Sequence, residues 1–155
     1  MADALIDTWR IGGKVVQYVL AAVAPEALAD RGSTKGRSVG EMFAHIHNVR
    51  LMWLQSAAPA LLNGLAKIEK EAAGDKAGLD AALTVSAEAI ATMLDAAIAA
   101  GRVKGFKPHP SAFVGYLISH ESYHLGEIGV ALQQSGHALD KKTAFGIWEW
   151  GARSS

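Results

Sequence analysis

Cysteine is absent from the 155-residue sequence, so the chain can form neither a disulfide nor a thiolate metal site. Any metal would therefore be bound by histidine, carboxylate, carbonyl or water ligands. The sequence also lacks an excess of either charge, because 15 basic and 15 acidic residues cancel at pH 7. This balance argues against a nucleic-acid-binding surface as the main function.

Signals for export or membrane insertion are also missing. No run of 18 consecutive apolar residues occurs in the sequence, so we do not expect a membrane-spanning segment. The first 16 residues carry acidic side chains early and no basic segment before an apolar run, unlike a secretion signal. We therefore expect a soluble, cytoplasmic protein, and the length fits a single domain over residues 1–155.

Helical periodicity dominates the pattern of apolar residues, whereas the alternation typical of strands is absent. Four principal helices are predicted, at about residues 2–24, 39–56 and 79–100 and around residues 113–132. Pro25 ends the first, a loop at 31–37 follows, Ser38 and Glu41 form a capping box before the second, and Gly101 ends the third. The predicted fold class is all-α: a four-helix bundle with a short additional helical segment at 60–69 and an apolar C-terminal tail.

Two histidines in the fourth predicted helix are the first candidates for a functional site. His120 and His124 share one helical stripe with Phe113, Leu117 and Ile128. Side chains four residues apart project in the same direction, with Cβ atoms about 5–6 Å apart, so both rings can reach one metal ion. The alternative is that each histidine is an ordinary, hydrogen-bonded interior residue.

The second predicted helix offers a third histidine. His45 shares a stripe with Met42, Val49 and Met52, whereas His47 lies about 200° around the helix axis. This favours His45 as the third metal ligand and leaves His47 as the alternative. Three imidazoles from two helices would leave coordination positions open for water or substrate, as in catalytic zinc sites.

Other polar residues near these histidines are candidates for catalysis and binding. Glu127, three residues after His124, could orient a ligating histidine or a bound water. Glu121 could act as a proton carrier or point toward a neighbouring helix, and for both carboxylates a solvated or structural role is the alternative. Asn48 and Arg50 could line an entrance for a cofactor or substrate, where Arg50 would suit an anionic group; the alternative for these is a surface salt bridge.

Several motifs together resemble the DinB/YfiT-like superfamily of four-helix-bundle metalloenzymes. They are Trp9 in the first helix, His45-Ile46 followed by Trp53, the run HESYHLGEI at 120–128, and the ALQQSG and WEW segments near the C-terminus. In order and spacing the resemblance spans nearly the whole chain. It implies a helical bundle with a divalent metal, zinc or nickel, bound by His45, His120 and His124. His47 is additional to this pattern and leaves open which histidine of the second helix binds.

The resemblance also implies a function. Relatives of this kind include metal-dependent thiol transferases and isomerases that act on small molecules with a low-molecular-weight thiol as cofactor, and homodimers are common among them. We therefore expect the protein to act on a small-molecule substrate, with a divalent metal and a low-molecular-weight thiol as cofactors. We also expect it to form a homodimer.

Three other functions fit the same residues. A bundle that binds metal without turnover and a purely structural bundle would have the same apolar pattern. The letters of residues 120–124 also match the HExxH signature of zinc hydrolases, in which the glutamate is the general base. That class places its helix beside a sheet, and this sequence predicts none.

Overall fold

The computed structural model describes residues 2–32 and 35–155. Within these residues the fold is all-α and contains no strand, which confirms the predicted fold class. Four long helices form the bundle: α1 (Ala2–Ala22), α2 (Val39–Ala57), α3 (Lys76–Ala100) and α4 (Pro110–Gln134). The shorter elements are α5 (Lys141–Gly146) and four 3₁₀ helices, η1 (Pro25–Ala29), η2 (Pro59–Leu62), η3 (Lys70–Ala72) and η4 (Trp150–Arg153).

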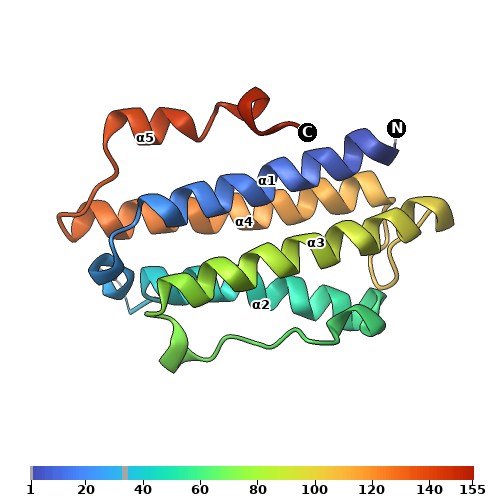
Figure 1. The fold of residues 1–155 in the computed structure, drawn as a ribbon, viewed down its shortest axis with the longest axis horizontal. Helices are drawn as coiled ribbons and strands as arrows, with labels where there is room; N and C mark the ends of the chain where they lie inside the picture. The colour runs from blue at the N-terminus through green and yellow to red at the C-terminus, as the bar shows by residue number, and fades with distance from the viewer. Residues whose placement is uncertain (1, 33–34) are drawn as a thin grey trace.

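The order of the helices places α2 against α4. Figure 1 shows α1 lying beside α4, with α2 and α3 together on the other side of the bundle. The connection from α2 to α3 runs back along α2, so these two helices point in the same direction. The packing of α2 on α4 is what brings the candidate histidines of the two helices within reach of one another.

Local capping sets the ends of the helices as the sequence predicts. The Ser38 hydroxyl accepts from the amide of Glu41 at 3.1 Å, and the Glu41 carboxylate accepts from the Ser38 amide at 3.2 Å. At the end of α3, Gly101 adopts the left-handed conformation with φ of 77°, which glycine reaches without a steric penalty. The loop expected at 31–37 is non-helical where it is described, and its residues 33–34 lie outside the described residues.

Helix α1 is continuous through the Gly12-Gly13 pair because neighbouring helices approach it closely there. A Cβ atom on Gly12 would lie 3.1 Å from the Ile118 side chain of α4, and one on Gly13 would lie 3.4 Å from Ala87 of α3. The glycines therefore leave room for close helix packing, which offsets their low helix propensity.

The predicted helical segment at 60–69 is wrong for most of its length. After η2, residues 63–69 run back along α2 without helical structure, and we call them the return segment. The Asn48 side chain makes two hydrogen bonds to the backbone of Ile68 in this segment. Its Nδ2 atom donates to the Ile68 carbonyl at 3.0 Å, and its Oδ1 atom accepts from the Ile68 amide at 2.9 Å. These bonds satisfy backbone groups that a helix would otherwise pair internally. The C-terminal tail, in turn, contains the short helix α5.

By length and composition α3 could cross a membrane, but a helix in the core of a bundle passes the same test. Leu79, Leu83, Ile90 and Leu94 are each no more than 1% exposed. They are covered by the other helices of the bundle, so the apolar character of α3 is accounted for by the core.

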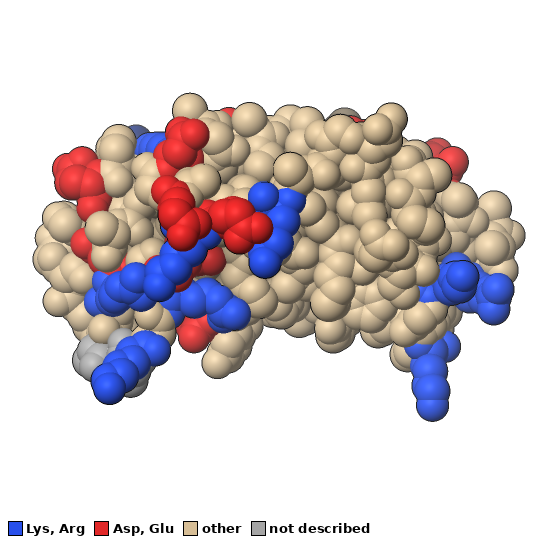
Figure 2. All heavy atoms as spheres, turned by 90° about the horizontal axis from the view of Figure 1, so that it is seen from below, with Lys and Arg blue, Asp and Glu red and all other residues tan. Residues whose placement is uncertain are grey.

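Charged side chains gather at the two ends of the face shown in Figure 2. Acidic and basic residues are mixed at the left end, whereas the group at the right end is mainly basic. The right end is where α3 connects to α4 (Figure 1), and the exposed residues of this connection include Arg102, Lys104 and Lys107.

Candidate metal centre

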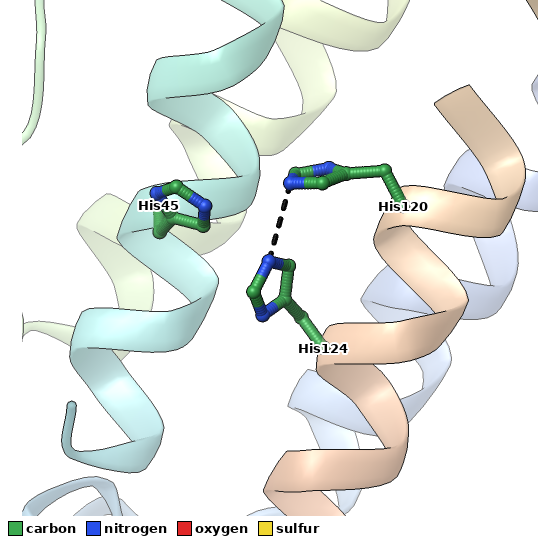
Figure 3. A group of neighbouring side chains, drawn as sticks. All are labelled: His45, His120 and His124. Atoms are coloured by element: carbon green, nitrogen blue, oxygen red, sulfur yellow. Dashed lines mark hydrogen bonds between the residues drawn. The ribbon is translucent and has the colours of Figure 1, made fainter. Parts of the chain in front are cut away.

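Three histidines converge between α2 and α4. His45 projects from α2, while His120 and His124 project from successive turns of α4, and Figure 3 shows the three rings turned toward one another. One ring nitrogen from each histidine can be chosen so that all three lie within 4.8 Å of one another. The Nε2 atoms of His120 and His124 are 3.1 Å apart. The cluster predicted from the helical spacing is thus present in the fold.

A hydrogen bond determines which nitrogen of the His124 ring carries the proton. His124 Nδ1 lies 2.7 Å from Glu127 Oε1. Because a carboxylate only accepts hydrogen bonds, His124 donates its Nδ1 proton to Glu127, and its Nε2 lone pair is then directed into the cluster. A carboxylate behind a histidine is the arrangement that orients metal-binding imidazoles and raises their basicity.

The environment keeps the other two rings neutral. Burial, together with a smaller contribution from the nearby positive charge of Arg37, lowers the pKa of His45 to about 4. Burial also lowers the pKa of His120, with a smaller contribution from His124. Neutral imidazole is the form that binds a metal, so both rings are ready to donate a lone pair at neutral pH.

The alternative of an ordinary, hydrogen-bonded interior histidine does not fit His120. Buried polar groups normally have hydrogen-bond partners. Among the described residues, however, His120 Nδ1 is buried without a partner, and the Nε2 atom of His120 contacts only another imidazole. Nitrogens that face each other and lack carbonyl or carboxylate partners suit an ion between them. Three nitrogens bound to one tetrahedral ion at about 2.0–2.1 Å lie roughly 3.4 Å from one another, so the cluster, whose nitrogens lie within 4.8 Å of one another, would contract on binding.

His47 is the histidine that does have a structural role. It is 1% exposed, and its Nε2–H donates to the carbonyl of Ala66 in the return segment at 2.9 Å. The structure therefore brings His45, and not His47, to the pair on α4.

The stripe from which His45 was predicted is nevertheless not the core stripe of α2. Met52 on that stripe is 55% exposed. The core stripe instead consists of Phe43, Ile46, Arg50 and Leu54, all completely buried. The charge of Arg50 hides this stripe in the sequence, because an arginine rarely occupies a fully buried position.

Arg50 and Glu121 form a buried ion pair and do not line an entrance. The Arg50 Nε and Nη2 atoms donate to the two carboxylate oxygens of Glu121 at 2.8 and 2.7 Å. Arg50 Nη1 donates to the carbonyl of Leu83 and to the hydroxyl of Ser86, both at 3.0 Å. The expectation that Arg50 lines an entrance is therefore wrong, because its guanidinium faces the core. Of the two roles considered for Glu121, the structure shows the side chain pointing toward a neighbouring helix.

The same contacts weigh against the zinc-hydrolase alternative. In HExxH enzymes the glutamate must reach water at the metal, whereas Glu121 is 3% exposed and bound to Arg50. A sheet is also missing from the described part of the chain. Asn48, the other predicted binding residue, is likewise occupied, because its amide is bound to Ile68.

A groove of about 640 Å³ lies next to the histidines. Glu127 lines this groove and connects it to His124. Tyr123 lines it too, and its ring centroid is 5.4 Å from that of His124. Arg37 also lines this groove and was missed in the sequence. Its position just before a capping box gives no periodic signal, so only its place in the fold reveals it.

Comparison with known proteins agrees with the fold. A family model described as the DinB family matches residues 1–144. This range contains all four bundle helices and the three clustered histidines. No curated protein and no solved structure matches the chain.

Proposed function

The chain belongs to the DinB family, and we propose that His45, His120 and His124 bind a divalent metal ion, zinc or nickel, in an enzyme that acts on a small molecule. The observation that carries this proposal is the convergence of three ring nitrogens, one from each histidine, within 4.8 Å. Imidazole ligands suit zinc and nickel among the divalent metals, and the chain has no thiolate that would compete.

Three protein ligands would leave the remaining coordination positions for water or substrate, as in catalytic zinc sites. When bound, such a metal supplies Lewis acidity, which lowers the pKa of water or of a thiol that reaches it. This chemistry supports a thiol S-transferase or isomerase type of reaction with a low-molecular-weight thiol as cofactor. The groove of about 640 Å³ is within the size range of small-molecule sites, roughly 300–1,000 Å³.

Residues of the chain would assist in different ways. Glu127 holds His124 in one tautomer and lines the groove, so it is also placed to take a proton from a bound substrate. Arg50 and Glu121 hold α2 and α4 together next to the histidines. This pair is a positioning element, since it is buried away from the groove.

The metal-binding part of the proposal is tested with protein purified without an affinity tag. Metal content is measured by mass spectrometry, and zinc and nickel are titrated into the chelator-treated protein. We expect about one metal ion per chain, and loss of this metal in the His45→Ala, His120→Ala, His124→Ala triple variant. A wild-type protein that binds no stoichiometric metal, or a triple variant that binds as the wild type does, would refute the site.

The enzymatic part needs a separate assay. Consumption of a low-molecular-weight thiol is followed across a panel of small electrophiles with zinc or nickel restored. Turnover that disappears in the triple variant and falls in Glu127→Gln supports the thiol-transferase or isomerase type. A protein that binds metal tightly but is inactive across the panel would instead be a metal-binding bundle.

A further inference from the structure

The groove beside the histidines has a polar end and an apolar wall. It lies between the connection that precedes α2 and the second half of α4. Its lining residues are Gly32, Gly36, Arg37, Met42, Tyr123, Gly126, Glu127, Val130, Ala131 and Gln134. Val130 is 51% exposed and Tyr123 is 67% exposed, so both are open to a ligand from solvent.

Arg37 is the cation of this groove. It is exposed, and within residues 2–32 and 35–155 no carboxylate lies within ion-pair distance of it. The neighbouring arginines differ, because Arg31 donates to Glu41 at 2.6 Å and Arg50 is buried against Glu121. The guanidinium of Arg37 therefore remains available for an anion from outside the protein.

Arg37 is also close to the histidine cluster. It lines the same groove as Glu127, whose Oε1 atom lies 2.7 Å from Nδ1 of His124, and as Tyr123, whose ring centroid is 5.4 Å from that of His124. One small molecule can consequently contact Arg37 and reach the histidines at the same time.

The rest of the groove suits an apolar body. Met42, Val130 and Ala131 supply apolar wall. Gly126 on α4 leaves space, since a Cβ atom placed there would meet nothing within 4 Å. Glu127 brings a negative charge to the same groove, so a ligand with a single negative charge is favoured over a phosphate dianion.

We propose that this groove binds a small monocarboxylate with an apolar body. The carboxylate is bound by the planar fork of Arg37, the body packs on Met42, Val130 and Ala131, and the far end of the molecule reaches the histidine cluster. Placing the reactive end at the histidines rests on the proposed function. Recognition of the carboxylate by Arg37 does not depend on a metal.

The test uses 4-phenylbutyrate as the probe and 4-phenylbutyramide as its neutral counterpart. Binding is measured by calorimetry to the metal-free and to the zinc-loaded full-length protein. We expect the carboxylate to bind at least about tenfold more tightly than the amide. Arg37→Gln should remove this difference in both metal states, whereas Arg102→Gln, which removes an exposed arginine at the other end of the bundle, should bind within about twofold of the wild type.

Several results would overturn the proposal. They are equal binding of acid and amide, unchanged binding by Arg37→Gln, or no binding of either probe. A carboxylate that binds only the zinc-loaded protein and is insensitive to Arg37→Gln would be a ligand of the metal, and tighter binding of phenyl phosphate than of the carboxylate would reject the monocarboxylate class. Failure of zinc to bind, with carboxylate recognition by Arg37 intact, would refute the proposed metal site and leave this inference standing.

Discussion

Arg50 of α2 and Glu121 of α4, which are 71 positions apart in the sequence, join through two hydrogen bonds of 2.8 and 2.7 Å inside the bundle. Arg50 follows His45 on its helix by five positions, and Glu121 directly follows His120. The pair therefore sets how α2 and α4 meet next to the histidine cluster. The Trp9 ring of α1 covers Arg50, with 5.1 Å between the ring centroid and the guanidinium carbon.

Removal of one partner from this pair should strongly destabilise the protein. Glu121→Ala leaves the Arg50 charge buried without compensation, and we expect a loss of about 3–5 kcal/mol in the free energy of unfolding. Urea denaturation followed by circular dichroism measures this. Glu88→Ala is the control, because it removes the carboxylate of an exposed ion pair with Arg10 and should cost no more than about 1 kcal/mol. Similar losses in the two variants would contradict a buried structural role for Glu121.

His45 and His47 should respond in opposite ways to substitution by alanine. His45→Ala removes a proposed ligand and should weaken zinc binding by at least about 100-fold, with little change in stability. His47→Ala removes the hydrogen bond to Ala66 and should lower the free energy of unfolding by about 1–3 kcal/mol while zinc affinity stays near that of the wild type. Zinc affinity is measured by competition with a chromogenic chelator. Equal effects on zinc affinity would mean that the structure assigns the wrong histidine.

Glu127 should influence metal affinity although it is not one of the three proposed ligands. Glu127→Ala deprives the His124 Nδ1 proton of its acceptor, and such losses typically reduce metal affinity by about 10–100-fold. Glu127→Gln should be affected less, because the amide oxygen can still accept from His124. The same chelator competition measures both, and Glu88→Ala serves as the control for losing a helical carboxylate. Wild-type affinity in Glu127→Ala would exclude this orienting role.

Stability of the chelator-treated protein should fall in mildly acidic solution. Burial lowers the pKa of His45 from 6.5 to about 4 in the folded state, so between these pH values the unfolded chain binds more protons than the folded one. Stability is then complete above about pH 6.5 and is lost as the pH falls toward 4. We expect a contribution on the order of 1–2 kcal/mol, less than the full pKa shift implies, because the cluster is partly open to water.

The measurement for this pH effect is a set of urea midpoints between pH 7.5 and pH 4.5. His45→Gln should show a smaller decline than the wild type, since glutamine does not titrate. His137→Gln is the matched control, because His137 is bound to Asp30 near the surface rather than placed in the cluster. An unchanged decline in His45→Gln would show that other groups cause the acid sensitivity.

The sequence by itself determined the features that depend on neighbours along the chain. The helices follow from the 3.6-residue period, and their ends at Ser38 and Gly101 follow from capping within a few residues. The meeting of His120 and His124 is of the same kind, because a four-residue spacing fixes it within one helix. The helical prediction for 60–69 failed where bonds to Asn48, about 20 positions away, replace local ones.

Only the tertiary structure decided which groups from different helices meet. From the sequence of α2 alone, either His45 or His47 could face α4. The orientation of α2 in the bundle brings His45 to the histidine pair. The burial of Arg50, its pairing with Glu121 and the exposure of Arg37 beside the cluster likewise depend on how distant segments pack. Periodicity identifies the sides of a helix, whereas the packing of the whole bundle determines which side faces which partner.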